Sequence, residues 1–580
     1  MQQICSLDFE CYLLLNCANQ SDCRGQEPGK ALMSLVTTAD RYWQTLRHLR
    51  PGQIWGRVLF RLARPTPDIS SAPPRRALRG HWQPPAHRPT SLPSPRQFRF
   101  LNQDGDLDKL GWDDPGTDKL WRYNQHYFDD LNAHGAAARH GWHLSLLEDW
   151  VDQNPPGKRT GWEPYPTSLR IANWVKWSLS GNDLPGGCRQ CLAVQARWLT
   201  RRLERHLLGN HLFANAKALI YAGLWFEGDE ARKWLETGFG ILAWEVPEQI
   251  LPDGGQFELS TMYHSLAVED MLDLINVARS FPEALTADQK KQVVDWEARI
   301  PTMLHWLHTL CHPDGRIAFF NDAAFGIAPS VEELGAYAGR LGFPAPKVDA
   351  PLVWLADSGY GRLSLPEATL LIDMARVGPD YLPGHAHADT LSCEFSLHGQ
   401  RVIVNSGTSL YGTSPERLRQ RGTAAHSTVF VAGRNSSEVW GGFRVARRAK
   451  ILSARVHQEG DTLIAEGTHD GYRRLSGRPV HRRRWQLSPG SLMIEDMLSD
   501  DRHPAEARFH LHPDITATQI ASDRGACRLP SGQQLSWRVR GGEARLEPSS
   551  WHPEFGLSLP STCLVLDLRG PTSALSLSWN

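Results

Sequence analysis

The chain has 580 residues and balances 63 Lys and Arg against 63 Asp and Glu, so its formal net charge is zero. That length exceeds one ordinary hydrophobic core, and we therefore expect two or more domains. A neutral chain has no overall basic field, which argues against a nucleic-acid partner. No run of about twenty apolar residues occurs, so no transmembrane helix is predicted.

Residues 1–32 are predicted to be a disordered leader or a mis-called start, because Met33 begins a stretch typical of a natural N-terminus. They make a poor secretion signal, so the compartment stays open between the cytoplasm and the periplasm. Residues 33–115 are expected to hold N-terminal helices and a Pro-rich wrap. The apolar spacing within 38–62 predicts helices whose apolar side packs on the main body.

Residues 116–350 show the apolar spacing of a series of helices joined by short loops. The expected helices are 142–153, 167–179, 188–208, 213–226, 231–250, 260–280 and 287–310. Serial helical hairpins form a bundle, a solenoid or an α/α toroid, and local periodicity does not separate these arrangements.

Residues 351–580 change to short segments of alternating polarity separated by turn residues. The expected strands include 368–374, 392–397, 401–404, 427–431, 463–466, 482–487, 492–496 and 563–568. This pattern is typical of an antiparallel sandwich. The predicted fold class is therefore α+β and multidomain, helical first and β second.

The segment Gly384-His385-Ala386-His387-Ala388-Asp389 is the strongest candidate for chemistry. On an extended segment, a period of two places His385 and His387 on the same face. His426, which precedes another predicted strand, can add a third imidazole. Such a set can hold a metal, supply a catalytic base, or do both.

Two polar clusters in the helical half are further candidates. Asn210 and His211 lie at a helix start, where they either cap the helix or bind an anionic group such as a carboxylate. Tyr263 is either a buried phenol or a catalyst. The chain has no Gly-x-Ser-x-Gly elbow, no phosphate-binding Gly loop and no His-Glu-x-x-His motif.

These motifs together resemble the heparinase II/III family of polysaccharide lyases, including its alginate-lyase-like members, over roughly residues 120–450. The resemblance is carried by Asn210-His211, Asp253-Gly254-Gly255 with Tyr263-His264, His385 to Asp389, Asn405-Ser406-Gly407-Thr408 and Thr423-Ala424-Ala425-His426. It implies an incomplete α/α toroid followed by an antiparallel β-sandwich. It also implies cleavage of an acidic, uronic-acid-containing polysaccharide by β-elimination, with a link to exopolysaccharide or capsule metabolism.

The resemblance assigns roles to four residues. Asn210 and His211 would neutralise the uronate carboxylate, which stabilises the charge that develops when the C5 proton leaves. Tyr263 and His385 would be the acid/base pair, and their order depends on whether elimination is syn or anti. Aromatic and cationic side chains suited to an acidic sugar polymer are expected to bind substrate, namely Tyr123, His126, Trp162, Tyr411 and Arg417.

The resemblance also implies one structural divalent metal, zinc or calcium. Its ligand positions here are His387, Asn405 and His426, where the family has Asp at the middle position. A neutral amide is a weaker zinc ligand than a carboxylate, so both an occupied and an empty site stay open.

Two alternatives to lysis stay open. A uronate C5-epimerase would use the same acid/base pair without breaking the chain. A non-catalytic glycan-binding protein would need no such pair, and a hydrolase would need two spaced carboxylates that no cluster here supplies. The identity of the polymer, endo or exo action and the oligomeric state also stay open.

Overall fold

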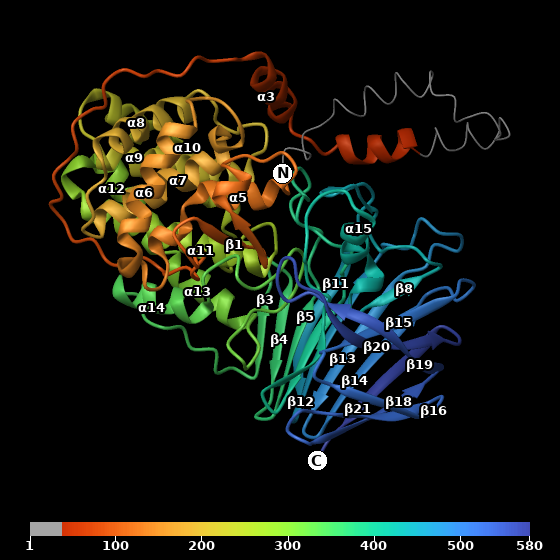
Figure 1. The fold of residues 1–580 in the computed structure, drawn as a ribbon. Helices are drawn as coiled ribbons and strands as arrows, with labels where there is room; N and C mark the ends of the chain where they lie inside the picture. The colour runs from red at the N-terminus through yellow and green to blue at the C-terminus, as the bar shows by residue number, and fades with distance from the viewer. Residues whose placement is uncertain (1–37) are drawn as a thin grey trace.

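The computed structural model describes residues 38–580, so the predicted leader 1–32 lies outside the described residues. Figure 1 shows the helices gathered in one half of the molecule and the strands in the other, with the C-terminus in the strand half. Among the described residues, no helix is long and apolar enough to span a membrane. The prediction of a mixed chain, helical first and β second, is confirmed.

The helical half is built around α9, which is apolar on nearly all sides and buried along its whole length, as expected of a central helix. Helices α7, α8, α10 and α11 pack against it. The helices of this half are α5 Lys119–Tyr127, α6 His140–Gln153, α7 Pro164–Leu179, α8 Gly186–Thr200, α9 Gly209–Trp225, α10 Asp229–Gln249, α11 Thr261–Ser280, α12 Ala287–Glu297, α13 Ile300–Thr309 and α14 Val331–Arg340.

Two predicted helices have different bounds in the structure. The stretch predicted as one helix at 287–310 is two, because Pro301 lies in the first turn of α13 and favours a new start there. The helix predicted at 188–208 ends at Thr200. Leu208 then adopts a left-handed backbone with φ 63° directly before α9, which no helix of L-residues can contain.

The N-terminal helices differ in part from prediction in what they contact. Residues 38–46 and α3, Pro51–Leu62, are helical as expected. Several apolar side chains of α3 are largely exposed, since Ile54 is 53% exposed, Leu59 61% and Leu62 75%, but Phe60 packs on the His206 ring with centroids 4.4 Å apart. The helix therefore contacts the body as predicted, through Phe60 and through Gln53, which donates to the Tyr381 carbonyl. The prediction was wrong for Ile54, Leu59 and Leu62, because apolar spacing identifies the apolar side chains of a helix and not their partners.

Among the described residues, the strand half holds two large antiparallel sheets and a two-stranded one, in which β9 Val439–Trp440 pairs with β10 Arg444–Val445. One large sheet has the order β11-β12-β13-β14-β21-β18-β17-β16, and the other has the order β19-β20-β15-β7-β6-β5-β4-β3, with β8 also paired to β15. Buried side chains from both large sheets, such as Phe395 and Trp485, belong to one apolar core. The first strand of this half begins at Leu352, next to the boundary predicted at 350.

The bounds of these strands are β3 Leu352–Leu355, β4 Tyr360–Ser364, β5 Ala368–Asp373, β6 Cys393–Leu397, β7 Gln400–Val404, β8 Val429–Val431, β11 Ile451–Glu459, β12 Thr462–His469, β13 His481–Ser488, β14 Ser491–Leu498, β15 Ala505–Leu511, β16 Thr516–Ala521, β17 Arg524–Arg528, β18 Gln534–Arg540, β19 Gly542–Trp551, β20 Leu559–Leu568 and β21 Thr572–Ser578. Every pairing between them is antiparallel.

The shared core of the two sheets predicts the effect of a matched pair of substitutions. Leu397 is fully buried in this core, whereas Leu452 on β11 is 46% exposed. Leu397→Ala should lower the free energy of unfolding by about 2–5 kcal/mol, because it leaves a cavity. Leu452→Ala should change it by about 0.5 kcal/mol or less. Chemical denaturation of both variants tests this, and equal losses would contradict the assigned core.

Candidate active site

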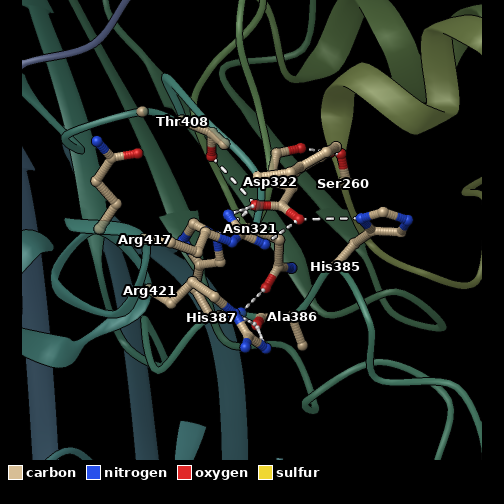
Figure 2. A network of polar contacts seen from close by, with 12 residues as sticks. Ser260, Asn321, Asp322, His385, Ala386, His387, Thr408, Arg417 and Arg421 are labelled. Atoms are coloured by element: carbon tan, nitrogen blue, oxygen red, sulfur yellow. Dashed lines mark hydrogen bonds and ion pairs between the residues drawn. The ribbon is translucent and has the colours of Figure 1, made fainter. Parts of the chain in front are cut away.

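A buried carboxylate, Asp322, lies at the centre of the candidate site, between the helical and strand halves (Figure 2). Arg417, on the short helix α15 Pro415–Arg421, binds both of its oxygens, with Nη2 at 2.7 Å from Oδ2. His385 Nδ1 lies 2.9 Å from Oδ2, and His387 Nε2 lies 2.8 Å from Oδ1. Thr408 Oγ1 donates a further hydrogen bond, at 3.2 Å.

These contacts keep Asp322 ionised. Burial alone would raise its pKa, but the Arg417 guanidinium and the two imidazoles hold the pKa well below its usual range. An ionised carboxylate only accepts hydrogen bonds, so His385 must carry a proton on Nδ1. Its Nε2 then has a free lone pair whenever the ring is neutral, as a general base requires.

The segment with the two histidines is a loop and not the predicted strand. Two hydrogen bonds to the loop between α13 and α14 hold this segment in place. Asp322 N–H donates to the His385 carbonyl at 3.0 Å, and His387 N–H donates to Asn321 Oδ1 at 2.9 Å. Both rings still reach one carboxylate. The prediction of a shared location holds, although its geometric reason was wrong.

Tyr263 lies in the first turn of α11, whose start is capped by the Ser260 hydroxyl. Its ring stacks on the His385 ring with centroids 3.8 Å apart, and its hydroxyl lies 3.0 Å from the Tyr411 hydroxyl. Burial and the neighbouring Tyr411 raise the pKa of Tyr263 well above its usual value. The phenol is therefore protonated and suited to donate a proton.

Tyr263 also lines a groove between the two halves of the molecule. Its wall from the helical half includes Tyr165 and Asn210, and its wall from the strand half includes Tyr411 and Phe555. The inner and outer parts of the groove share Tyr263 and Tyr165. Phenols, amides and an aromatic ring are surfaces that suit a sugar chain.

The pair Asn210-His211 lies at the start of α9, as predicted. Asn210 lines the inner part of the groove, and its buried Nδ2 has no hydrogen-bond partner among the described residues. His211 Nδ1 lies 3.1 Å from Glu204, and its ring packs on Tyr165. An unpaired amide donor beside Tyr263 can bind an oxygen acceptor of a ligand.

The structure brings only one of the five predicted substrate-binding residues to the groove, Tyr411. His126 and Trp162 are buried in the helical core, where His126 accepts from Trp150 and Trp162 donates to the Asn154 carbonyl. Tyr123 is buried against Glu163. Arg417 binds Asp322 and so acts on the site through that carboxylate.

The structure places two of the three predicted metal ligands against each other. His387 Nδ1 and His426 Nε2 face each other at 3.2 Å. Asn405, however, uses both amide atoms within the protein, accepting from Ser427 N–H at 3.0 Å and donating to Ser392 at 3.3 Å. Among residues 38–580 no group of three His, Cys, Asp or Glu side chains is placed to hold a metal. Whether a metal binds stays a prediction.

Sequence reasoning missed Asp322 and its neighbour Asn321. A signal was present, since both are polar and interrupt an apolar run from Ile317 to Phe325. Asn321 has a left-handed backbone with φ 58° and donates to the Leu259 carbonyl. A polar pair inside a buried run is unusual and needs partners, which here are site residues.

Part of the backbone strain among the described residues lies at this site. Leu208, Leu259 and Asn321 are non-glycine residues with φ between 58° and 63°. They lie within two residues of Asn210, Ser260 and Asp322, so each strained turn precedes a residue of the site. Such conformations persist only where surrounding contacts enforce them, and they are typical of functional sites.

The sequence comparisons match most of the chain. Residues 138–334 match the family described as Heparinase II/III N-terminus, and residues 347–580 match Heparinase II/III-like, C-terminal. The chain belongs to the heparinase II/III family. The family predicted from the motifs is therefore confirmed.

The relatives matched by sequence and by structure carry different names. A heparin-sulfate lyase of Bacteroides thetaiotaomicron is 32% identical over 385 residues, covering 58% of this chain and 52% of that protein. The FtsZ-localized protein C of Caulobacter vibrioides is 24% identical over 510 residues, covering 80% and 83%. A crystal structure of heparinase III aligns with a TM-score of 0.62 at 17% identity, covering 79% and 76%. The chain spans about half the length of the curated heparin-sulfate lyases that it matches.

Asp322 predicts a large loss of stability when its charge is removed. Asp322→Asn keeps the side-chain shape but leaves the buried Arg417 without a counter-charge, which should lower the free energy of unfolding by about 3–5 kcal/mol. Asp496→Asn is a matched comparison and should behave alike, because Asp496 is likewise held by a buried arginine, Arg483, in the strand half. Denaturation should find similar losses in both variants, and an unchanged Asp322→Asn variant would contradict the central role of the pair.

The third metal position predicts an effect of restoring the family carboxylate. Asn405→Asp would place a carboxylate beside the two imidazoles, and metal affinity should rise relative to the unchanged protein. Elemental analysis after equilibration with zinc measures it, with Asn405→Asp/His426→Ala as the control that should lose the gain. If neither the unchanged protein nor Asn405→Asp binds zinc, the predicted metal site is wrong for this protein.

Proposed function

We propose that the protein is a polysaccharide lyase that cleaves a uronic-acid-containing polysaccharide by β-elimination. The observation that carries the proposal is the stack of Tyr263 on His385, whose Nδ1 is held by the ionised Asp322. A protonated phenol and an imidazole are therefore in direct contact beside the groove. Elimination needs one such acid and one such base.

In the proposed reaction, His385 Nε2 removes the C5 proton of the uronate. The C5–H electron pair forms the C4–C5 double bond while the C4–O4 bond breaks, and the Tyr263 hydroxyl protonates the departing O4. The raised pKa of Tyr263 favours this assignment, because the phenol begins the reaction protonated. Loss of the C5 proton puts charge on the uronate carboxylate, which Asn210 and His211 would stabilise.

Glu258 supports the imidazole in this scheme. Its Oε2 lies 3.7 Å from His385 Nε2, and although burial raises the pKa of Glu258, a charge on His385 lowers it again. A nearby carboxylate favours the imidazolium that forms after proton transfer. After the product leaves, His385 loses its proton and the Tyr263 phenolate regains one through the solvent, which restores both groups.

We also propose that the helices form an incomplete α/α toroid and that the two sheets face each other as a sandwich. The likeness to the heparinase III fold and the core shared by both sheets support this arrangement. The names of the heparin-sulfate lyases support an acidic polysaccharide as substrate. A link to exopolysaccharide or capsule metabolism is part of the same proposal.

Ultraviolet absorbance of the protein mixed with a panel of uronate polymers tests the proposal. The C4–C5 double bond absorbs, so turnover gives a rising signal. Tyr263→Phe should lower the rate about 10²–10⁴-fold by removing the acid. Tyr472→Phe is the matched control, because that buried hydroxyl donates to a carbonyl in the strand half and should leave the rate unchanged.

Other outcomes separate the alternatives. Exchange of the C5 proton with deuterated solvent, without absorbance or chain shortening, would identify an epimerase. Binding without either signal would identify a glycan-binding protein. A Tyr263→Phe variant as active as the unchanged protein would overturn the assigned acid.

A further inference from the structure

The charged side chains that line the groove suggest what kind of acidic polymer it accepts. Among the described residues, the inner and outer parts of the groove are lined by four cations, which are Arg88, Arg99, Lys176 and Lys217. They are also lined by four carboxylates, which are Asp129, Glu269, Asp270 and Glu554. The formal charge of the lining is therefore zero.

The two lysines deep in the groove are already paired with carboxylates. Lys217 Nζ lies 2.7 Å from Asp270 and 2.5 Å from Asp273. Lys176 also contacts Asp273, which is fully buried. Neither lysine can turn to a ligand anion without leaving a buried carboxylate uncompensated, which is strongly unfavourable.

The two arginines are paired in the same way. Arg88 Nη2 lies 2.6 Å from Glu269, which is 4% exposed at its side chain. Arg99 Nε lies 2.6 Å from Asp104, and this pair is exposed. Each cation that lines the groove thus has its own carboxylate within the protein.

A sulfated polymer would meet this lining at a disadvantage. Each sulfate adds a permanent negative charge that needs a cation in a desolvated groove. Here the cations are occupied, and Asp129 and Glu554 would repel an added anion. A sulfate-rich chain would have to break existing ion pairs to bind.

A single uronate carboxylate has different requirements. The unpaired amide of Asn210 and the hydroxyl pair of Tyr263 and Tyr411, in which one O–H is used between the two, offer neutral donors at the place where the acid/base pair lies. Neutral donors bind one carboxylate without a new cation, and they also suit the hydroxyls of sugar rings. We propose that the substrate is a non-sulfated uronate polymer of low charge density, an inference that rests on the proposed function.

Matched polymers that differ only in sulfation test the inference. Heparan sulfate and chondroitin sulfate would each be compared with its chemically desulfated form, and alginate would serve as a third non-sulfated polymer. Calorimetry with His385→Ala, which removes the base and keeps the Asn210, Tyr263 and Tyr411 donors, measures binding without turnover, and absorbance with the unchanged protein measures cleavage. We expect tighter binding of each desulfated form and a weak dependence of its affinity on salt.

A pair of double variants tests the physical cause. Asp104→Asn/Glu554→Gln removes two carboxylates at the outer groove, so affinity for the sulfated polymers should rise about threefold or more relative to the desulfated ones. Asp229→Asn/Glu543→Gln removes the same charges from exposed pairs elsewhere and should change neither affinity. Equal responses of the two double variants would overturn the role of the lining.

The outcomes separate this inference from the proposed function. Preferred binding and cleavage of the sulfated polymers would overturn the inference and leave the lyase intact. Preferred binding of desulfated polymers without any absorbance would support the inference and overturn the lyase. No binding of any polymer would overturn the inference.

Discussion

The candidate site depends on the ion pair between Asp322 and Arg417. Both side chains are fully buried, and a buried pair is tolerated only when its remaining hydrogen-bonding capacity is also used. That capacity is used by His385, His387 and Thr408, so one carboxylate fixes three further residues. Asp322 comes from the loop between α13 and α14, and its partners come from the strand half. The pair therefore joins the two halves at the point where the groove lies.

The loops around this pair carry the strain that helices and strands avoid. Leu208, Leu259 and Asn321 have positive φ, and each lies within two residues of a side chain that faces the site. Their cost is compensated by packing, since Leu259 is fully buried and Asn321 is 4% exposed. The rigid helices and sheets thus hold irregular loops in one conformation, and the loops carry the chemistry.

Parts of this arrangement could be predicted from sequence, for reasons that differ by residue. Periodicity located most helices and strands, because burial of one face is a local pattern. It did not show that α3 leaves Ile54 and Leu59 exposed, since the partner of an apolar face is not encoded locally. Motif resemblance named Tyr263 and His385, which the structure does bring together. It did not name Asp322, because a lone carboxylate in an apolar run belongs to none of the motifs that carry the family resemblance.

The residues predicted to bind substrate show where composition misleads. Trp162 and His126 have polar neighbours in sequence, yet their ring nitrogens bond within the helical core. Polar neighbours in the sequence do not determine whether an aromatic side chain points into the core or toward the groove. Arg417 has the charge expected of a ligand for an acidic sugar, but a buried carboxylate was the nearer partner.

A second cluster in the strand half shows which contacts are specific to the site. Asp496 is held by both ends of Arg483 and by His481 Nε2 at 2.7 Å, and His481 Nδ1 lies 3.1 Å from His469 Nε2. Asp322, Arg417, His387 and His426 repeat the same chain of contacts. Burial lowers the pKa of His387 to about 4 and that of His426 to about 3, so both rings are neutral and one can donate to the other.

The facing imidazoles at the site therefore need no metal to explain them, because the same contact exists where no metal was predicted. What the second cluster lacks is a counterpart of His385 stacked on a tyrosine beside a groove. The buried Arg–Asp–His unit is a structural device that this fold uses twice. Chemistry becomes available only where the same carboxylate also orients a third residue, His385, against the protonated Tyr263.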